Sequence, residues 1–249
     1  MRIISVANQK GGTAKTSTAH ALATGATHLG KKSLAIDLDP QGNLTYLMGA
    51  NPDMPGSYEI LKREAPISEA IQHTEQGDVI SACLNLANAD TELSGKPGKD
   101  FFLKTALETI GDSYDIIVID TPPALGTLLI NALTASNEVV IPVSADALSL
   151  QGLFQLNETI KQVQYYYNKS LAVSGILLTK YSGRTILARD LKETIAETCN
   201  ELQIPMYESV IREGIAAREA QAMRESLFDY AKKSNPAQDY LAWFKEINL

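Results

Sequence analysis

The sequence predicts an α/β fold in which a mostly parallel, twisted β-sheet is covered by helices on both faces. Two observations carry this prediction. Short segments rich in β-branched residues alternate with helix-length segments along the 249 residues, which is the pattern of a parallel sheet with crossover helices. One strand-like segment, residues 114–120 (YDIIVID), is almost continuously apolar. Such a run is typical of a central strand buried on both faces.

The remaining elements follow the same alternation. The expected strands are residues 2–7, 33–37, 78–81, 114–120, 138–143, 171–179 and 206–211. The expected helices are residues 16–29, 101–110, 127–135, 148–167 and 185–202, followed by a closing helix. Residues 51–98 contain four prolines and are the least regular stretch. We expect surface insertions with short helices there, and therefore a single domain spanning residues 1–249.

Composition excludes several classes of protein. No apolar run is long enough to cross a membrane, and the first residues lack the pattern of a signal peptide, so we expect a cytoplasmic protein. Cys83 and Cys199 are isolated, which favours two reduced, mostly buried thiols over a disulfide or metal site. The net charge of −7 argues against a protein coated in nucleic acid, but a local basic patch stays open.

The first strand leads into a glycine-containing loop and then directly into a helix. This arrangement suits a phosphate cradle, because glycines let backbone N–H groups turn toward an anion and the helix N-terminus adds its dipole. Lys15 would contact the β- and γ-phosphates of a nucleotide, and the Thr16 hydroxyl would bind Mg²⁺. A chance diglycine turn with surface lysines is the alternative. The predicted nucleotide-binding residues are Lys10, Gly11, Gly12, Thr13, Ala14, Lys15, Thr16 and Ser17.

Three aspartates follow predicted strands. Asp37 and Asp39 end the second strand beside the loop, where open α/β sheets bind ligands, although turn-capping aspartates would look the same. Asp120 ends the apolar strand 114–120. An apolar strand ending in Asp is a Walker B pattern, in which the carboxylate holds Mg²⁺.

The loop departs from the usual phosphate-loop consensus in carrying a second lysine, Lys10, before its glycine pair. Residues 10–17 (KGGTAKTS) therefore resemble the deviant Walker A motif of the MinD/ParA superfamily of P-loop NTPases. The resemblance implies an ATP-sandwich homodimer in which Lys15 acts in cis and Lys10 in trans. Ala14 stands where glycine is commoner, and an alanine is tolerated there if its φ is helical.

Two further segments resemble the ParA/Soj branch of this superfamily. Residues 37–43 (DLDPQGN) resemble its switch I, which implies that Asp39 positions the attacking water and Asp37 supports the Mg²⁺ shell. Residues 120–126 (DTPPALG) resemble its switch II, which implies a Mg²⁺ role for Asp120 and a nucleotide contact for Pro122. The implied catalytic residues are Lys10, Lys15, Asp39 and Asp120, and the implied metal ligands are Thr16, Asp37 and Asp120.

The resemblance extends over essentially the whole chain, and it implies a cofactor pair, ATP and Mg²⁺, and a function. ATP binding would drive dimerisation and affinity for double-stranded DNA of any sequence, and hydrolysis stimulated by a ParB-like centromere-binding partner would reset the switch. A nucleoid-associated cytoplasmic location follows from DNA binding. With nine residues before Lys10, we expect the short type without an N-terminal helix-turn-helix.

Relatives of the same superfamily supply the alternatives. Nitrogenase-type iron proteins need cluster-bridging cysteines, for which Cys83 and Cys199 are not placed. MinD-like positioning ATPases end in a basic amphipathic helix, whereas the last residues here carry one lysine against Asp239 and Glu246, so we expect a core-packed helix and no membrane binding. A metabolic ATPase or kinase of the same fold would require a substrate pocket, for which the sequence gives no residue set.

The DNA-binding residues are the least defined part of the prediction. Residues 182–185 (SGRT) match a family segment whose arginine, here Arg184, contacts DNA. A second family arginine aligns with Ala216, so other basic residues would have to replace it. Residues 180–233 are neutral overall, and a solvated surface without function is the alternative. The candidate DNA contacts are Arg184, Arg212, Arg218, Lys232 and Lys233.

Overall fold

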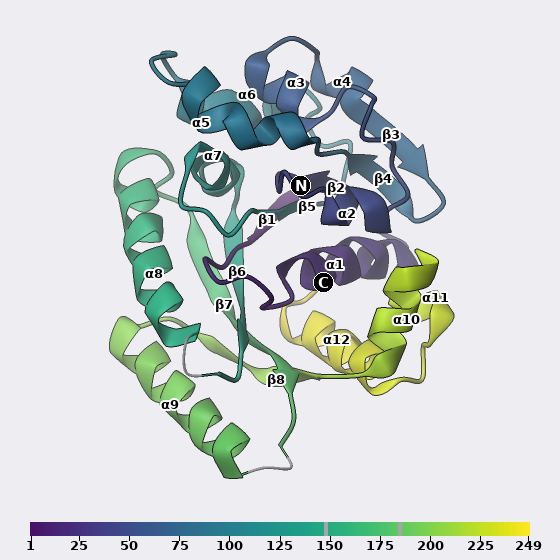
Figure 1. Cartoon of the computed structure of the whole chain (residues 1–249), viewed down its shortest axis with the longest axis vertical. Coiled ribbons are helices and arrows are strands. Elements are labelled where there is room, and N and C mark those ends of the chain that lie inside the picture. The colour runs from purple at the N-terminus through teal and green to yellow at the C-terminus, as the bar shows by residue number, and fades with distance from the viewer. Residues whose placement is uncertain (147–148, 184–185) are drawn as a thin grey trace.

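The computed structural model describes residues 1–146, 149–183 and 186–249. Its strands form one sheet with the order β3-β4-β2-β5-β1-β6-β7-β8 (Figure 1). All neighbouring strands are parallel except β3 and β4, so the predicted mostly parallel sheet is confirmed. The strands are β1 (Arg2–Val6), β2 (Ser33–Asp37), β3 (Ile71–Thr74), β4 (Gly77–Ile80), β5 (Ile116–Asp120), β6 (Glu138–Ser144), β7 (Ala172–Tyr181) and β8 (Met206–Arg212).

Helices connect the strands and cover the sheet. The α-helices are α1 (Lys15–His28), α2 (Asn43–Leu47), α3 (Ser57–Lys62), α4 (Ile67–Ala70), α5 (Ala89–Glu92), α6 (Phe102–Glu108), α7 (Thr127–Ala135), α8 (Ser149–Tyr166), α9 (Ile186–Leu202), α10 (Ile215–Met223), α11 (Leu227–Tyr230) and α12 (Asn235–Glu246). Two short 3₁₀ helices are η1 (Leu84–Asn88) and η2 (Lys99–Phe101). Each predicted strand matches an observed strand to within two residues at either end. The antiparallel β3 was not predicted.

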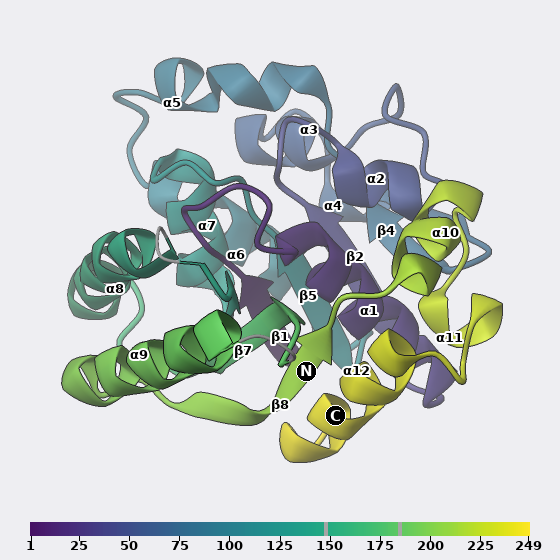
Figure 2. The same cartoon turned by 60° about the horizontal axis from the view of Figure 1, so that its bottom comes forward.

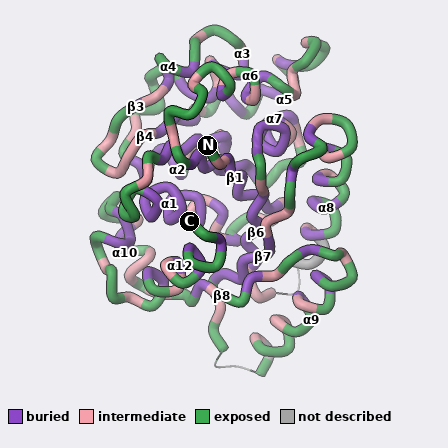
Figure 3. Tube along the Cα trace, turned by 180° about the vertical axis from the view of Figure 1, so that it is seen from behind, coloured by how far each residue is buried: buried purple, intermediate pink, exposed green. Residues whose placement is uncertain are grey.

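The two faces of the sheet have separate cores, because successive side chains of a strand point to opposite faces. On β5, Ile116 and Val118 join a core with helices α1, α2 and α10–α12, whereas Ile117 and Ile119 join one with α3, α6 and α7. A third cluster fills the space between β6, β7, α8 and α9. The tube in Figure 3 shows this layering as buried strands and helix faces surrounded by exposed outer turns.

The closing helix α12 packs into the core, as the sequence predicted. Trp243 and Phe244 are almost completely buried, and Phe244 lies so close to Gly25 of α1 that a Cβ there would meet its ring at 2.2 Å. Glycine at this position therefore allows α1 and α12 to approach closely. Among the helices of the described residues, none is both long and apolar enough to cross a membrane.

Helix α12 also supplies hydrogen-bond acceptors to β8, the last strand of the sheet. The Glu246 carboxylate accepts hydrogen bonds from the backbone N–H groups of Glu208 (2.7 Å) and Ser209 (3.1 Å). Asp239 accepts one from the N–H of Arg212 at 2.9 Å and forms an ion pair with its guanidinium at 2.6 Å. Side chains of α12 thus accept hydrogen bonds from three backbone N–H groups of β8.

Candidate nucleotide-binding site

The carboxyl ends of β1, β2 and β5 meet at one edge of the sheet. Asp120 lies in register with Val6 of β1 on one side and with Asp37 of β2 on the other. The loop after β1 borders a cavity of about 800 Å³. The predicted nucleotide-binding residues among its lining are Gly11, Gly12, Ala14, Lys15, Thr16 and Ser17, and Asp39 also lines it.

Two residues of the loop have left-handed backbone angles before α1 begins. Gly12 has a φ of +78°, and Ala14, the N-cap of α1, has φ 63° and ψ 30°. The condition for tolerating alanine here, a helical φ, is therefore not met, since the residue is left-handed. The reason is geometric, because turning backbone N–H groups toward one point requires alternating backbone hands. An alanine in this conformation is strained relative to glycine.

Lys15 lies mostly buried at the start of α1, and its ammonium group donates a hydrogen bond to the Lys10 carbonyl at 3.0 Å. Burial lowers the pKa of Lys15, and the charges of Asp120 and Asp39 oppose this decrease. The two carboxylates favour the charged form of the buried Lys15 ammonium, and a charged ammonium at the cavity can bind phosphate.

Asp37 is a fully buried carboxylate, and both of its oxygens accept hydrogen bonds from neighbouring residues. It accepts hydrogen bonds from the backbone N–H of Thr45 at 2.8 Å, from the Thr45 hydroxyl at 2.7 Å and from the N–H of Asp39 at 3.0 Å. Burial raises its pKa to about 6, against the effect of these hydrogen bonds. Asp37 therefore anchors the segment that carries Asp39.

Asp120 differs from Asp37, because neither of its carboxylate oxygens has a hydrogen-bond partner among the described residues, although both are buried. Burial raises its pKa, and the charge of Asp37 adds to the increase, while the nearby Thr16 hydroxyl and Lys15 oppose it. A buried carboxylate without a donor is costly, and a cation beside it would remove that cost. Thr16 and Asp120 thus fit a Mg²⁺ site.

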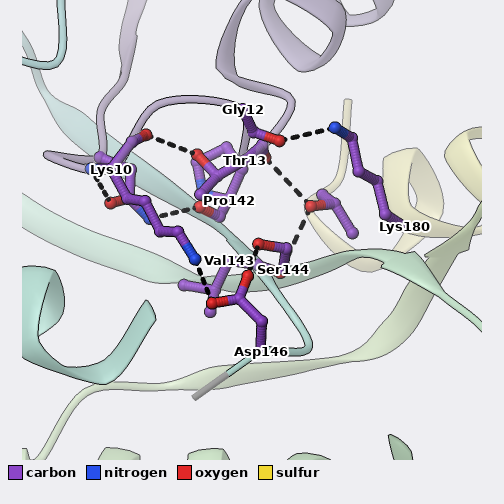
Figure 4. Close-up of polar contacts among 10 residues, drawn as sticks. Lys10, Gly12, Thr13, Pro142, Val143, Ser144, Asp146 and Lys180 are labelled. Carbon is purple, nitrogen blue, oxygen red and sulfur yellow. Dashed lines mark hydrogen bonds and ion pairs between the residues drawn. The ribbon is translucent and has the colours of Figure 1, made fainter. Parts of the chain in front are cut away.

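Lys10 lies on the other side of the loop (Figure 4), where its ammonium group pairs with the carboxylate of Asp146. The Asn8 side chain fixes the backbone here, accepting from the Lys10 N–H at 2.9 Å and donating to the Pro142 carbonyl at 2.6 Å. Sequence reasoning gave Asp146 no role, since it lies 136 residues from Lys10.

Two residues at the end of β7 also contact the loop. The Lys180 ammonium donates to the Gly12 carbonyl at 2.7 Å (Figure 4). The Thr179 hydroxyl donates to the Thr13 carbonyl at 3.0 Å. Both contacts fix the path of the loop, and both Thr179 and Lys180 line the cavity as well. Neither residue was predicted to support the loop.

The remaining candidates lie at different distances from the cavity. Pro122 is buried, and the next residue, Pro123, lines the cavity instead. Arg212 and Arg218 line its far wall, and Arg212 is engaged by Asp239. Lys232 and Lys233 are exposed between α11 and α12. Arg184 lies outside the described residues.

Known proteins resemble the chain in sequence and in structure. A family profile described as an AAA domain matches residues 1–173. The sporulation initiation inhibitor protein Soj of Bacillus subtilis is 38% identical over 250 residues, covering 99% of this chain and 98% of Soj. The chromosome partitioning protein ParA of Myxococcus xanthus is 35% identical over 250 residues, covering 99% of this chain and 87% of that protein.

Solved structures agree with this relationship. A structure named as cobyrinic acid a,c-diamide synthase from Mycobacterium smegmatis, with bound ADP and magnesium, has a TM-score of 0.81 at 32% identity and covers 100% of this chain and 97% of its own. A putative plasmid partition protein from Borrelia burgdorferi B31, bound to AMPPNP, has a TM-score of 0.80 at 27% identity, with 98% of both chains covered. The resemblance identified from the motifs is thus confirmed, and the chain belongs to the ParA/Soj family of partition ATPases.

Proposed function

We propose that this protein is an ATP-dependent DNA-partition ATPase. Mg²⁺ and ATP bind in the cavity, the loaded chain forms a homodimer, and the dimer binds double-stranded DNA without sequence preference. Hydrolysis stimulated by a ParB-like partner resets it. One observation carries the proposal: the phosphate loop borders the cavity, and its Lys15 and Thr16 side chains lie beside the buried carboxylate of Asp120.

The loop and its neighbours would hold the nucleotide in named roles. Backbone N–H groups of residues 11–16 and the buried Lys15 ammonium bind the phosphates, while Thr16 and Asp120 hold Mg²⁺. Bound Mg²⁺ neutralises charge that develops on the phosphate oxygens. Structures of relatives named with ADP and magnesium, and with AMPPNP, support this assignment.

Asp39 is the candidate for positioning the attacking water. It lines the cavity, and its carboxylate accepts a hydrogen bond from the Gln41 N–H at 3.0 Å. Asp37 holds the Asp39 backbone in place at 3.0 Å. A carboxylate fixed in this way on the cavity wall can orient a water molecule toward a γ-phosphate.

A metabolic ATPase is the second candidate. The M. smegmatis structure named as cobyrinic acid a,c-diamide synthase is 32% identical to this chain. This similarity is the observation that favours an amide-forming enzyme as the second candidate. Such an enzyme hydrolyses ATP only with its acceptor substrate, whereas a partition ATPase responds to DNA and needs no small-molecule acceptor. A MinD-like role is disfavoured, because α12 buries Trp243 and Phe244 against the core.

The test is size-exclusion chromatography of the wild type with ATP and Mg²⁺, with ADP, and without nucleotide, each repeated with a random-sequence duplex. We expect a dimer only with ATP, and co-elution with DNA only in that state. Lys15→Ala is the control, because it removes the main charge partner of the phosphates and should prevent both changes. A monomer under every condition, or DNA binding that ignores nucleotide, would contradict the proposal. Confirmed DNA binding would also support a cytoplasmic, nucleoid-associated protein.

A further inference from the structure

Helix α10 forms one wall of the nucleotide cavity, contributing Ala217, Arg218, Gln221 and neighbouring residues. Figure 2 shows it beside α1 and α2, the two helices that follow the phosphate loop and the Asp39 segment. We propose that the last turn of α10, through Gln221 and Arg224, clamps this helix onto the bound nucleotide and reports whether ATP or ADP is present. The inference rests on the proposed function, whose nucleotide it concerns.

The first contact joins α10 to the phosphate loop helix. The Gln221 side-chain amide donates a hydrogen bond to the Ser17 hydroxyl at 2.7 Å. Ser17 lies in the first turn of α1 and lines the cavity. Its hydroxyl accepts from Gln221 and keeps its own proton to donate, so a phosphate oxygen and Gln221 can bind the same hydroxyl at once. Successive hydrogen bonds of this kind strengthen one another.

The second contact joins the same turn to the Asp39 segment. The Arg224 guanidinium lies 3.9 Å from the centroid of the Tyr46 ring, a cation–π distance. Tyr46 belongs to α2, which begins directly after residues 39–42, and its ring also lines the cavity. A movement of Asp39 toward a γ-phosphate would therefore shift α2, and the shift of Tyr46 would change its contact with Arg224.

A third residue ties these elements into one unit. The Gln76 side-chain amide donates to the Arg224 carbonyl at 2.8 Å and to the Leu47 carbonyl. Its oxygen is hydrogen-bonded to His20 of α1 at 2.8 Å. The ends of α10 and α2 are thus joined to α1 through Gln76, and a displacement of one is resisted by the others.

The Gln221 and Arg224 contacts should respond to different parts of the nucleotide. Ser17 faces the phosphates that ATP and ADP share, so Gln221 should hold α10 in place with either nucleotide. The Arg224–Tyr46 contact is already present without nucleotide. Because the Asp39 segment responds to the γ-phosphate, ATP should strengthen this contact and ADP should not. Gln221 is therefore a positioning residue for Ser17. Helix α10 carries the exposed Arg218. The position of Arg218 would therefore change with the nucleotide that is bound.

Hydrogen–deuterium exchange read by mass spectrometry tests the clamp on the full chain, with AMPPNP or ADP and Mg²⁺. In the wild type, exchange of residues 10–17 and 215–223 should slow with both nucleotides, and residues 215–223 should slow further with AMPPNP. Gln221→Ala should keep slowed exchange in residues 10–17, lose most of it in 215–223, and weaken AMPPNP binding about 3- to 10-fold, the worth of one hydrogen bond. Arg224→Ala should abolish only the difference between AMPPNP and ADP.

Two further variants separate the clamp from a loss of folding. Gln221→Asn keeps an amide but shortens the side chain, so it should behave like Gln221→Ala. Glu219→Ala, at an exposed position of the same helix that does not line the cavity, should behave like the wild type. Unchanged exchange of residues 215–223 in the wild type, with residues 10–17 slowed, would overturn the clamp and leave the proposed function standing. Absence of slowed exchange in residues 10–17 would overturn both.

Discussion

The ammonium group of Lys10 is paired with Asp146 of its own chain, and the second oxygen of that carboxylate accepts a hydrogen bond from the Ser144 hydroxyl at 2.5 Å. Ser144 thus orients Asp146 toward the loop. In the proposed dimer Lys10 acts on the partner's phosphates, so this ion pair has to open first. Both side chains are partly exposed, and such a pair contributes at most about 1 kcal/mol. A phosphate contact outweighs it.

Asp146→Asn should therefore favour the ATP-bound dimer. Removing the Asp146 charge weakens the intramolecular hold on Lys10 by no more than the ion pair, so the dimer dissociation constant should fall about 2- to 5-fold. Sedimentation equilibrium with AMPPNP and Mg²⁺ measures it. Asp112→Asn, whose side chain is 91% exposed, is the matched control. Lys10→Ala should retain nucleotide binding as a monomer but lose the dimer, and normal dimerisation of that variant would refute the trans role.

Asp39→Ala should bind ATP and dimerise but lose hydrolysis, since only the water-positioning carboxylate is removed. Phosphate release in single turnover should fall at least about 100-fold, while the variant stays dimeric and bound to DNA. Wild-type turnover would move the catalytic role to another residue, with Asp37 first among the candidates.

Ala14→Gly should stabilise the folded chain. The left-handed φ of 63° strains alanine, and glycine relieves the strain, less the entropy it adds to the unfolded state. The net gain should be about 0.5–1 kcal/mol, seen as a midpoint about 1–4 °C higher in thermal unfolding. The same substitution at Ala196, inside α9, should lower the midpoint. A lower midpoint for Ala14→Gly would show that the methyl group makes a compensating contact.

Asp120→Asn should stabilise the nucleotide-free chain at pH 8 and abolish stabilisation by Mg²⁺ and ATP. Burial raises the pKa of Asp120, and raises that of Asp37 to about 6, above the ordinary value of 3.8. A carboxyl group with a raised folded-state pKa contributes stability at low pH that is lost as pH rises through that pKa. The wild type should therefore lose stability from about pH 4 upward, and the variant should lose less. Thermal unfolding from pH 4 to 8 with and without Mg²⁺ and ATP measures both effects, and identical profiles would contradict the assignment.

The basic residues of the C-terminal half should account for DNA binding. Lys232→Ala/Lys233→Ala should weaken ATP-dependent binding of a random duplex and make its salt dependence shallower. Binding with fewer phosphate contacts releases fewer counterions from the DNA. Arg184→Ala should act in the same direction. Lys161→Ala/Lys169→Ala, at exposed positions of α8 and the following turn, is the control. Equal weakening by the control would indicate an effect of overall charge.

The parts of this molecule that were predicted from sequence are the ones encoded locally. Strand β5 and the loop at Gly11–Gly12 follow from neighbouring residues, because apolar runs and glycine spacing act over a few positions. Asp146 and Gln221 were missed since they reach the loop from 136 and 204 residues away, and no local pattern records such contacts. The left-handed conformation of Ala14 could not be predicted from its neighbours for a related reason, since the path of the whole loop decides it.

The acidic side chains of α12 have a consequence for how copies of this protein meet. An uncovered outer strand offers a row of donors that invites another chain to extend the sheet. Here Glu246 and Asp239 occupy the outward donors of Glu208, Ser209 and Arg212. Sheet-to-sheet growth is thereby disfavoured at β8, and in the proposed dimer cycle the protein would be protected there from an association that nucleotide does not control.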